Sequence, residues 1–266
     1  MRSVLATRYV LALREGGSLP AIVEADDLGM YVVKFRGAGQ GALALTAEII
    51  AGEIGRALGL SVPELVLVEI DPVLGRNDPD AEIRHLLKAS VGTNVGLDYL
   101  PGSTDFNAAA GDRISAETAS MAVWFDSFVQ NVDRTPRNPN LLMWHRELRF
   151  IDHGAAMFFH HNWETMPAKA QSAFPQIEHH VLLPFASDLR AAAQRAHAVL
   201  DEVLLRRIIA MVPDILLAAT VESGDTEAIA AEAAAKREAY VRFFVERLAH
   251  SSIFEEEADR ARQRQL

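Results

Sequence analysis

The most informative segment of the chain is Asn131-Val132-Asp133-Arg134-Thr135-Pro136-Arg137-Asn138, and Ile151-Asp152-His153-Gly154 follows it. Asp133 lies in a proline-stiffened loop, and Asn138 comes five positions later. Asp152 follows Asn138 by fourteen positions, after a segment that predicts a short hairpin. The chain therefore carries an acid, an amide and a second acid in a fixed order near two turns.

This order and spacing match a known arrangement for phosphoryl transfer. In enzymes of the protein-kinase type, a loop aspartate acts as catalytic base and an asparagine five positions later binds magnesium. A second aspartate, two positions before a glycine, also binds magnesium. Each residue alone has a simpler explanation, because Asp and Asn favour turns for their own backbone hydrogen bonds. The residues taken together, with the elements described next, favour a functional site.

The composition is that of a globular protein with a sizeable core. The chain has 266 residues, of which 50% are hydrophobic and 23% charged, enough for one large domain or two lobes. The net charge of −10 argues against direct nucleic-acid binding and against binding to an anionic membrane. The absence of cysteine excludes disulfides, thiolate metal sites and cysteine nucleophiles. We expect neither a signal peptide nor a membrane span, and therefore a cytoplasmic protein.

The predicted architecture is α+β and two-lobed, with a strand-rich N-lobe that contains one helix and a mainly helical C-lobe. Apolar periodicity and turn signals predict strands at 9–13, 21–25, 30–35 and 65–70, and a helix at 43–58. The glycine-punctuated segment 92–102 places the boundary, so the lobes comprise residues 1–95 and 96–266. In the second lobe we expect helices 116–129, 199–211 and 226–248, a hairpin of 141–144 with 148–151, and a solvated or frayed helix end at 255–260.

Lys34 in the strand-rich lobe is a candidate ligand for phosphate. It shares one face of its strand with Val32 and Arg36, and the earlier turn Gly16-Gly17-Ser18 would fold over that face. Backbone N–H groups of the turn could bind phosphates that the ammonium also reaches. The alternatives are a lysine on a wet face and an ordinary hairpin loop. Glu48 borders the apolar face of the next helix and would need a partner if covered, so we expect an ion pair with Lys34.

A second glycine motif supports a competing hypothesis. The segment Gly37-Ala38-Gly39-Gln40-Gly41-Ala42 fits G-x-G-x-x-A between a strand and a helix, as in a dinucleotide-binding turn. An NAD(P)-binding enzyme that uses Gly37 and Gly39 is therefore an alternative. The first strand of such folds is buried on both faces, whereas this strand carries Lys34 and Arg36. No regular alternation of strands and helices follows it.

The histidines of the second half show no recognised metal motif. Adjacent pairs point in divergent directions, and no H-E-x-x-H spacing occurs. We expect surface or packing roles for them, with the histidine beside Asp152 as the exception to consider. The residues are His153, His160, His161, His179 and His180.

The chain resembles the HipA-like kinase family, bacterial relatives of the protein-kinase and phosphatidylinositol-kinase folds. The resemblance extends from about residue 14 to about residue 156. Its most specific segments are GGSLPAIVEADDLGMYVVKFRGAGQG (16–41), AEIIAGEIGRALGLSVPELVLVEID (47–71), NVDRTPRNPNLLMW (131–144) and FIDHG (150–154).

The resemblance implies a role for each matching residue. Lys34 would contact the nucleotide phosphates, and Glu48 would hold that lysine. Asp133 would be the catalytic aspartate, while Asn138 and Asp152 would bind Mg²⁺. The cofactors implied are ATP and Mg²⁺.

The same resemblance places the hinge that holds adenine near Leu97-Asp98-Tyr99-Leu100, with Asp98 and Tyr99 as candidate contacts.

Two positions depart from the pattern of the family. Thr135 stands where many relatives have histidine, and His153 stands where protein kinases have phenylalanine. No A-P-E-like segment follows, and the length leaves no room for the extra N-terminal subdomain of full-length HipA toxins. A toxin role is therefore not implied.

The function that follows is ATP- and Mg²⁺-dependent transfer of the γ-phosphate to an unidentified hydroxyl acceptor, for which a protein Ser or Thr is one candidate. A kinase-fold nucleotide-binding module and an AMP-transferring enzyme remain alternatives beside the NAD(P) hypothesis. The sequence specifies neither the acceptor nor the oligomeric state.

Overall fold

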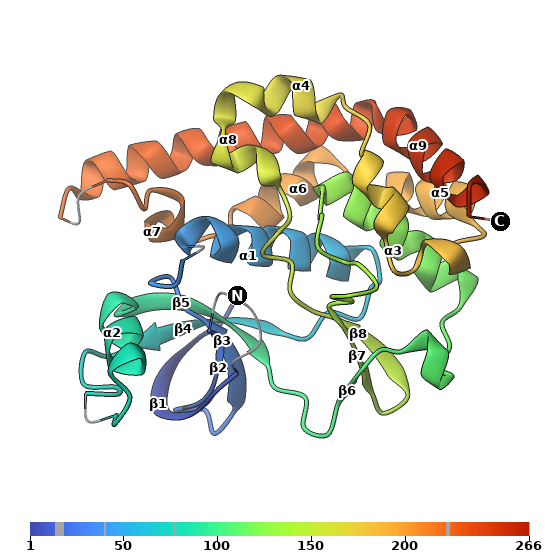
Figure 1. Cartoon of the computed structure of the whole chain (residues 1–266). Helices are drawn as coiled ribbons and strands as arrows, with labels where there is room; N and C mark the ends of the chain where they lie inside the picture. Colours follow the sequence, from blue (N-terminus) through green and yellow to red (C-terminus); the bar gives the residue numbers. More distant parts are fainter. Residues whose placement is uncertain (14–18, 40, 77, 222–223, 266) are drawn as a thin grey trace.

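Five strands in the N-terminal part of the chain close into a small barrel (Figure 1). The computed structural model describes residues 1–13, 19–39, 41–76, 78–221 and 224–265. The strands follow the order β1-β2-β3-β5-β4, and the parallel pairing of β1 with β4 closes the barrel. The other neighbouring pairs are antiparallel. The strands are β1 (Ser3–Ala12), β2 (Ala21–Ala25), β3 (Met30–Lys34), β4 (Leu65–Ile70) and β5 (Gly92–Asp98).

Apolar side chains from alternate strand positions fill the barrel, because successive side chains of a strand point to opposite faces. On β3, Tyr31 and Val33 are buried in this interior. Helix α2 (Ala81–Ala89) covers the same core with its apolar face. Lys34, the next residue on β3, therefore lies on the opposite face, outside the barrel interior.

Helix α1 (Gly41–Ala57) lies between the barrel and the helices of the C-terminal part (Figure 1). All residues from 44 to 52 are buried, so this helix is enclosed on almost every side. Its glycines permit close packing, since a Cβ on Gly52 would lie 2.6 Å from the side chain of Leu65 on β4. The helix is thereby held against the barrel and presents Glu48 to the neighbouring strands.

The C-terminal part is mainly helical and shares one continuous hydrophobic core with α1. Helix α3 is its centre, since nearly every residue of it is buried. Gln130 ends α3 with a left-handed φ of 55° and turns the chain into the loop that carries Asp133. The helices are α3 (Ala116–Val129), α4 (Met166–Ala170), α5 (Leu189–Val199), α6 (Glu202–Ile209), α7 (Asp214–Leu217), α8 (Thr226–Ala249) and α9 (Ser251–Gln263).

A second, three-stranded sheet comprises β6 (Thr104–Asp105), β7 (Leu141–Trp144) and β8 (Glu147–Phe150). The turn between β7 and β8 contains only His145 and Arg146, with φ of 51° and 67°. Two successive positive φ angles give the turn type whose twist suits a two-residue hairpin. The predicted turn is therefore one residue too long, and β8 begins one residue earlier than expected.

Two further expectations differ from the structure in the first half of the chain. The glycine-punctuated segment, for which no element is predicted, contains a strand, because residues 92–98 form β5, paired with β3 on one side and β4 on the other. Gly96 is required there, since a Cβ would lie 2.8 Å from Val68. Helix α2 is absent from the predicted elements. The predicted boundary at residue 95 lies within β5, and the division into lobes remains a prediction.

The predicted helix ends also differ in the second half. The predicted helix 199–211 is shorter in the structure, where α5 ends at Val199 and Asp201 caps α6 by accepting from the N–H of Leu204. The predicted end at 255–260 is solvated at Glu256, Asp259 and Arg260, but it is not frayed, because α9 is a regular helix to Gln263. Helix α9 packs against α3 and α5, and Phe254 and Ala258 are buried.

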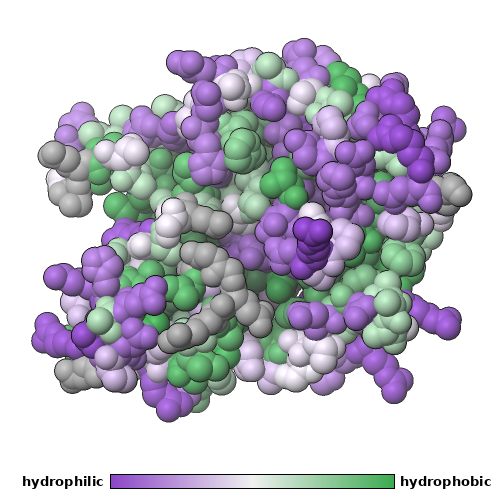
Figure 2. Space-filling model, in the orientation of Figure 1, coloured by the Kyte–Doolittle hydropathy of each residue, from purple (hydrophilic) through white to green (hydrophobic). Residues whose placement is uncertain are grey.

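Hydrophilic and hydrophobic residues are mixed over the face shown in Figure 2, which is hollowed at its left edge between the barrel below and the helices above. Some large apolar side chains are exposed, among them Leu28 and Val203, as is common on protein surfaces. Within the described ranges, no helix has the length and apolar character needed to cross a bilayer.

The packing of α9 can be tested by Phe254→Ala. The Phe254 ring is 1% exposed and lies 5.6 Å from the Trp124 ring, centroid to centroid. We expect the free energy of unfolding to fall by about 3–5 kcal/mol, because the change leaves a cavity in the core. Phe158→Ala is the control, since that side chain is 63% exposed and its loss should cost less than about 0.5 kcal/mol. Equal effects of the two changes in urea unfolding would contradict the placement of α9.

Candidate active site

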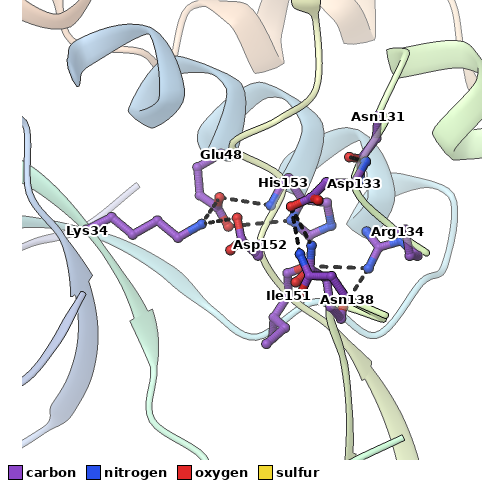
Figure 3. Close-up of polar contacts among 10 residues, drawn as sticks. Lys34, Glu48, Asn131, Asp133, Arg134, Asn138, Ile151, Asp152 and His153 are labelled. Atoms are coloured by element: carbon purple, nitrogen blue, oxygen red, sulfur yellow. Dashed lines mark hydrogen bonds and ion pairs between the residues drawn. The ribbon is translucent and has the colours of Figure 1, made fainter. Parts of the chain in front are cut away.

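Lys34 lies between two carboxylates that come from distant parts of the chain (Figure 3). Its Nζ is 2.6 Å from Oε2 of Glu48 on α1 and 2.6 Å from Oδ1 of Asp152, which follows β8. The side chain of Glu48 is fully buried, whereas that of Asp152 is 42% exposed. The ion pair between Lys34 and Glu48 is the one that the sequence predicts. Its extension to Asp152 is an additional feature of the structure.

The ion pair keeps both buried partners charged. Burial alone would raise the pKa of Glu48, but the attraction of Lys34 and hydrogen bonding by His153 outweigh it and lower the pKa of Glu48 to about 2. Burial likewise would lower the pKa of Lys34, and the two carboxylates reverse this and raise the pKa. Lys34 is therefore a fixed cation beside the exposed carboxylate of Asp152.

The backbone at residues 152 and 153 turns these two side chains in different directions. Asp152 has a φ of 54°, in the left-handed region that Asp and Asn tolerate better than most residues. The N–H of His153 donates to Oε2 of Glu48 at 2.9 Å. The His153 ring is fully buried and meets the Phe125 ring edge-on at 5.7 Å between centroids. His153 therefore has a packing role, while Asp152 faces solvent.

The loop after α3 folds back on itself and joins Asp133 to Asn138. Nδ2 of Asn138 donates to Oδ2 of Asp133 at 2.8 Å, and Nδ2 of Asn140 lies 3.4 Å from the same oxygen. Two backbone hydrogen bonds between Thr135 and Asn138 close the turn, at 3.0 and 3.1 Å. The N–H of Asp133 donates to Oδ1 of Asn131. The Asp133 carboxylate is thus held by amides and remains partly exposed.

A buried ionic network beneath the loop fixes its position. Nε of Arg134 donates to Oδ2 of Asp126 on α3 at 2.6 Å, and Nε2 of His180 lies 2.8 Å from the same oxygen. Nδ2 of Asn131 donates to the other carboxylate oxygen at 3.0 Å. Burial would raise the pKa of Asp126, but Arg134 outweighs it and the pKa is lowered. Burial lowers the pKa of His180.

Arg134 also joins the loop to the segment that carries Asp152. Its Nη1 donates to the carbonyl oxygens of Asn140 at 2.6 Å and Ile151 at 3.4 Å. The N–H of Ile151 donates in turn to the carbonyl of Asn140 at 3.1 Å. The guanidinium of Arg134, the residue after Asp133, therefore binds the carbonyl of Ile151, the residue before Asp152. The two polar clusters therefore lie next to each other (Figure 3).

The family model for HipA-like kinases matches residues 8–239. The chain belongs to the HipA-like kinase family. Among solved structures, its fold is similar to that of the proinflammatory kinase CtkA of Helicobacter pylori, with a TM-score of 0.52 and 16% sequence identity. This similarity covers 93% of this chain and 95% of that chain. No curated protein matches the chain. The family and the fold support a kinase-type phosphotransferase.

The structure brings the main candidates of this HipA-like kinase into two adjacent clusters. One contains Lys34, Glu48 and Asp152, and the other contains Asp133 and Asn138. The oxygens of Asp152 and Asn138 suit magnesium, which one or two carboxylates commonly hold together with substrate phosphates and water. Among the described residues, no three His, Asp or Glu side chains are grouped to hold a metal ion. The catalytic and metal-binding roles remain predictions.

The remaining candidates of the site lie apart from these clusters or outside the described ranges. Asp98 ends β5, and its N–H donates to the carbonyl of Glu64, while the N–H of Tyr99 donates to the carbonyl of Met30. These bonds fix the chain at the predicted adenine hinge, which remains a prediction. The turn Gly16-Gly17-Ser18 lies outside the residues that the structure describes.

The structure removes the basis of the NAD(P) hypothesis. A dinucleotide-binding turn joins a strand and a helix of a mainly parallel sheet, but β3 pairs antiparallel with both of its neighbours. Gly37 has a different reason to be glycine, since a Cβ would lie 2.6 Å from Cβ of Ala89 on α2. A Cβ on Gly39 would meet no atom within 4 Å. Neither glycine therefore indicates a nucleotide site.

Sequence reasoning did not assign roles to the residues that support the site. Asp126 and His180 lie 54 positions apart, and no local pattern joins them. Asn140, the second amide beside Asp133, has no distinguishing signal either. Arg134 could have been found, because a basic residue directly after the candidate base would need a counter-ion if the loop were buried.

The buried ion pair predicts a pH dependence that Glu48→Gln should remove. The folded-state pKa of about 2 lies below the ordinary 4.5, so the pair stabilises the protein fully above about pH 4.5 and loses this effect as the pH falls toward 2. Near neutral pH we expect Glu48→Gln to lower the free energy of unfolding by about 3 kcal/mol. The difference from wild type should shrink as the pH falls below about 4.5.

Urea unfolding at a series of pH values measures this difference. Glu53→Gln is the matched control on the same helix, because Glu53 forms only a partly exposed ion pair with Arg56 at 3.8 Å. That change should alter stability by less than about 0.5 kcal/mol. A Glu48→Gln deficit that stays constant from neutral to acidic pH would show that the carboxylate charge is not what stabilises α1.

Proposed function

We propose that this protein is an ATP- and Mg²⁺-dependent phosphotransferase that transfers the γ-phosphate to a hydroxyl acceptor. The observation that carries the proposal is the position of Lys34 between Glu48 and Asp152, each 2.6 Å from its Nζ. In kinases a strand lysine paired with a helix glutamate contacts the phosphates, and a following aspartate binds the metal. The membership in the HipA-like kinase family supports the same chemistry.

In the proposed complex, Glu48 holds Lys34 while the ammonium contacts nucleotide phosphates. Glu48 is buried and does not reach the substrate itself, so its part is to position the lysine. Asp152 is exposed and bonded to Lys34, so its carboxylate can exchange this partner for a metal ion without unfolding α1. Mg²⁺ supplies charge that offsets the negative charge on the phosphoryl oxygens.

Asp133 is the proposed base that orients and accepts the proton of the acceptor hydroxyl. Asn138 and Asn140 bond to one oxygen of its carboxylate, which fixes the side chain and leaves the other oxygen for the acceptor. General bases of this kind contribute about 10²–10⁴ in rate. The buried Asp126–Arg134 pair beneath the loop keeps this geometry constant between substrates.

In the proposed function, each predicted lobe contributes different residues to the site. The barrel with α2 would act as the N-lobe and contribute Lys34, and the helical part would act as the C-lobe and contribute Asp133, Asn138 and Asp152. Phosphates would then lie between them, where charge from both sides converges. A protein Ser or Thr is a candidate acceptor, and transfer of AMP is the competing reaction.

Nucleotide binding is tested by thermal unfolding with and without Mg-ATP. At about 100-fold excess over Kd, binding adds about 2.7 kcal/mol, which raises the Tm of a chain of this size by roughly 5–10 °C. We expect Asp152→Ala to abolish this rise, because it removes a metal ligand. Asp259→Ala, a change at an exposed position on α9, should retain it. A full Mg-ATP shift in Asp152→Ala would refute the assignment, and a shift with NAD(P) alone would restore the dinucleotide hypothesis.

The type of transfer is tested with ATP labelled on the γ- or the α-phosphate, incubated with the protein and a mixture of candidate acceptor proteins. We expect label from the γ-position in the product and a loss of about 10²-fold or more in rate for Asp133→Asn, because the base is removed. Asp133→Asn should still show the Mg-ATP thermal shift. Incorporation of the α-label would instead identify AMP transfer, and unchanged transfer by Asp133→Asn would remove this residue from the catalytic role.

A further inference from the structure

A cavity of about 400 Å³ lies between the N-terminal half of α1, helix α7 and helix α8. Its size is within the range of about 300–1,000 Å³ that is typical of small-molecule sites. Leu216 and Leu217 of α7 and Tyr240 of α8 form part of its apolar lining. Figure 1 shows α7 beside the first turns of α1, remote from the hairpin that leads to Asp152. The cavity is thus separate from the proposed nucleotide site.

The charges around the cavity favour an anion. Among the described residues that line it, none is acidic and Lys236 is the one cation, although the chain has a net charge of −10. Nζ of Lys236 lies 4.3 Å from the centroid of the Trp163 ring and 3.5 Å from Oε1 of Glu232. Helix α1 begins at this cavity with no acidic residue in its first turn, and the N-terminal end of a helix attracts negative charge.

Two buried polar side chains of the lining have atoms without a hydrogen-bond partner. Within the described part of the chain, Oγ1 of Thr46 and Nε2 of His160 make no hydrogen bond, and the two residues are 0% and 2% exposed. Buried polar atoms in native proteins nearly always have partners. The other ring nitrogen of His160 is satisfied, since Nδ1 lies 3.0 Å from Oη of Tyr240. Both residues line the cavity, so a molecule bound there would offer the missing partners after a small shift of these side chains.

We propose that this cavity binds a small carboxylic acid in its anionic form. The carboxylate would lie between Lys236 and Nε2 of His160, and the apolar body of the acid would pack against Leu216 and Leu217. A single ammonium suits a singly charged carboxylate better than a phosphate dianion. The hydroxyl of Tyr240 donates to Nδ1 of His160 in this arrangement, so that Nε2 carries the proton that the carboxylate accepts.

Burial supports this arrangement of the histidine. It lowers the pKa of His160 to about 3, with smaller contributions from His161 and Lys236. The ring is therefore neutral and offers one N–H as a donor, leaving Lys236 as the positive partner of the carboxylate.

A ligand in the cavity would affect the proposed active site through its contact with α1. Thr46 precedes Glu48 by two residues on that helix, and α7 packs against α1. A ligand that bridges α1 to α7 and α8 would stabilise the position of α1 and therefore of the Lys34–Glu48 pair. This consequence rests on the proposed function, whereas binding of the acid does not.

The test is binding of phenylacetate, indole-3-acetate and hexanoate to the full chain without nucleotide, by ligand-observed NMR and calorimetry. Each acid is compared with its neutral amide, which has nearly the same shape. We expect at least one acid to bind with a Kd near or below about 1 mM, and its amide roughly tenfold more weakly or worse. Lys236→Met, which keeps the apolar stem, should weaken that acid roughly tenfold or more. Thr46→Val should also weaken it, because the change removes the hydroxyl and keeps the volume.

Lys88→Met is the matched control, since Lys88 is exposed on α2, and it should leave binding unchanged. The proposal is overturned if no acid binds more tightly than its amide, or if Lys236→Met binds the acid as well as wild type. Both readouts are made without ATP. A failure here therefore leaves the proposed kinase activity unaffected, and a missing Mg-ATP shift would leave this result standing.

Discussion

The structure around the site depends on one requirement, that the buried carboxylate of Glu48 be paired. An isolated buried charge is costly, and loss of one partner of a buried pair typically costs about 3–5 kcal/mol. Lys34 on β3 meets this requirement at 2.6 Å, and the N–H of His153 supplies a second contact. Barrel, central helix and the segment after β8 are therefore held together at one carboxylate. The same contacts place the exposed Asp152 beside the lysine.

In the helical region, a second buried carboxylate likewise holds separate segments of the chain together. Asp126 on α3 binds Arg134, and Arg134 reaches the carbonyl oxygens on either side of β7 and β8. Neither group touches the proposed substrate. Their effect is to join Asp133 and Asp152 in one unit, so that the proposed base and the proposed metal ligand keep a constant separation. Preorganised charge of this kind is the main contribution that a protein makes to phosphoryl transfer.

Much of the fold and of the candidate site could be predicted from local sequence. The helix 116–129 and the Lys34–Glu48 pair follow from periodicity and from the cost of an unpaired buried acid. The elements that were missed depend on tertiary contacts. Residues 92–98 form a strand because β3 and β4 bond to both edges, and α9 is ordered along its length because Phe254, Ala258 and Ala261 are buried. The partners Asp126 and His180 of Arg134 come from separate segments, and their pairing exists only in the folded chain.

The most direct measurement is a crystal structure of the protein with Mg²⁺ and a non-hydrolysable ATP analogue. We expect a metal ion about 2.0–2.1 Å from oxygens of Asp152 and Asn138. We also expect Nζ of Lys34 to contact a phosphate oxygen and to keep its bond to Glu48. A nucleotide bound elsewhere, with the Lys34–Asp152 contact intact and no metal at Asp152, would show that these residues are not the nucleotide site.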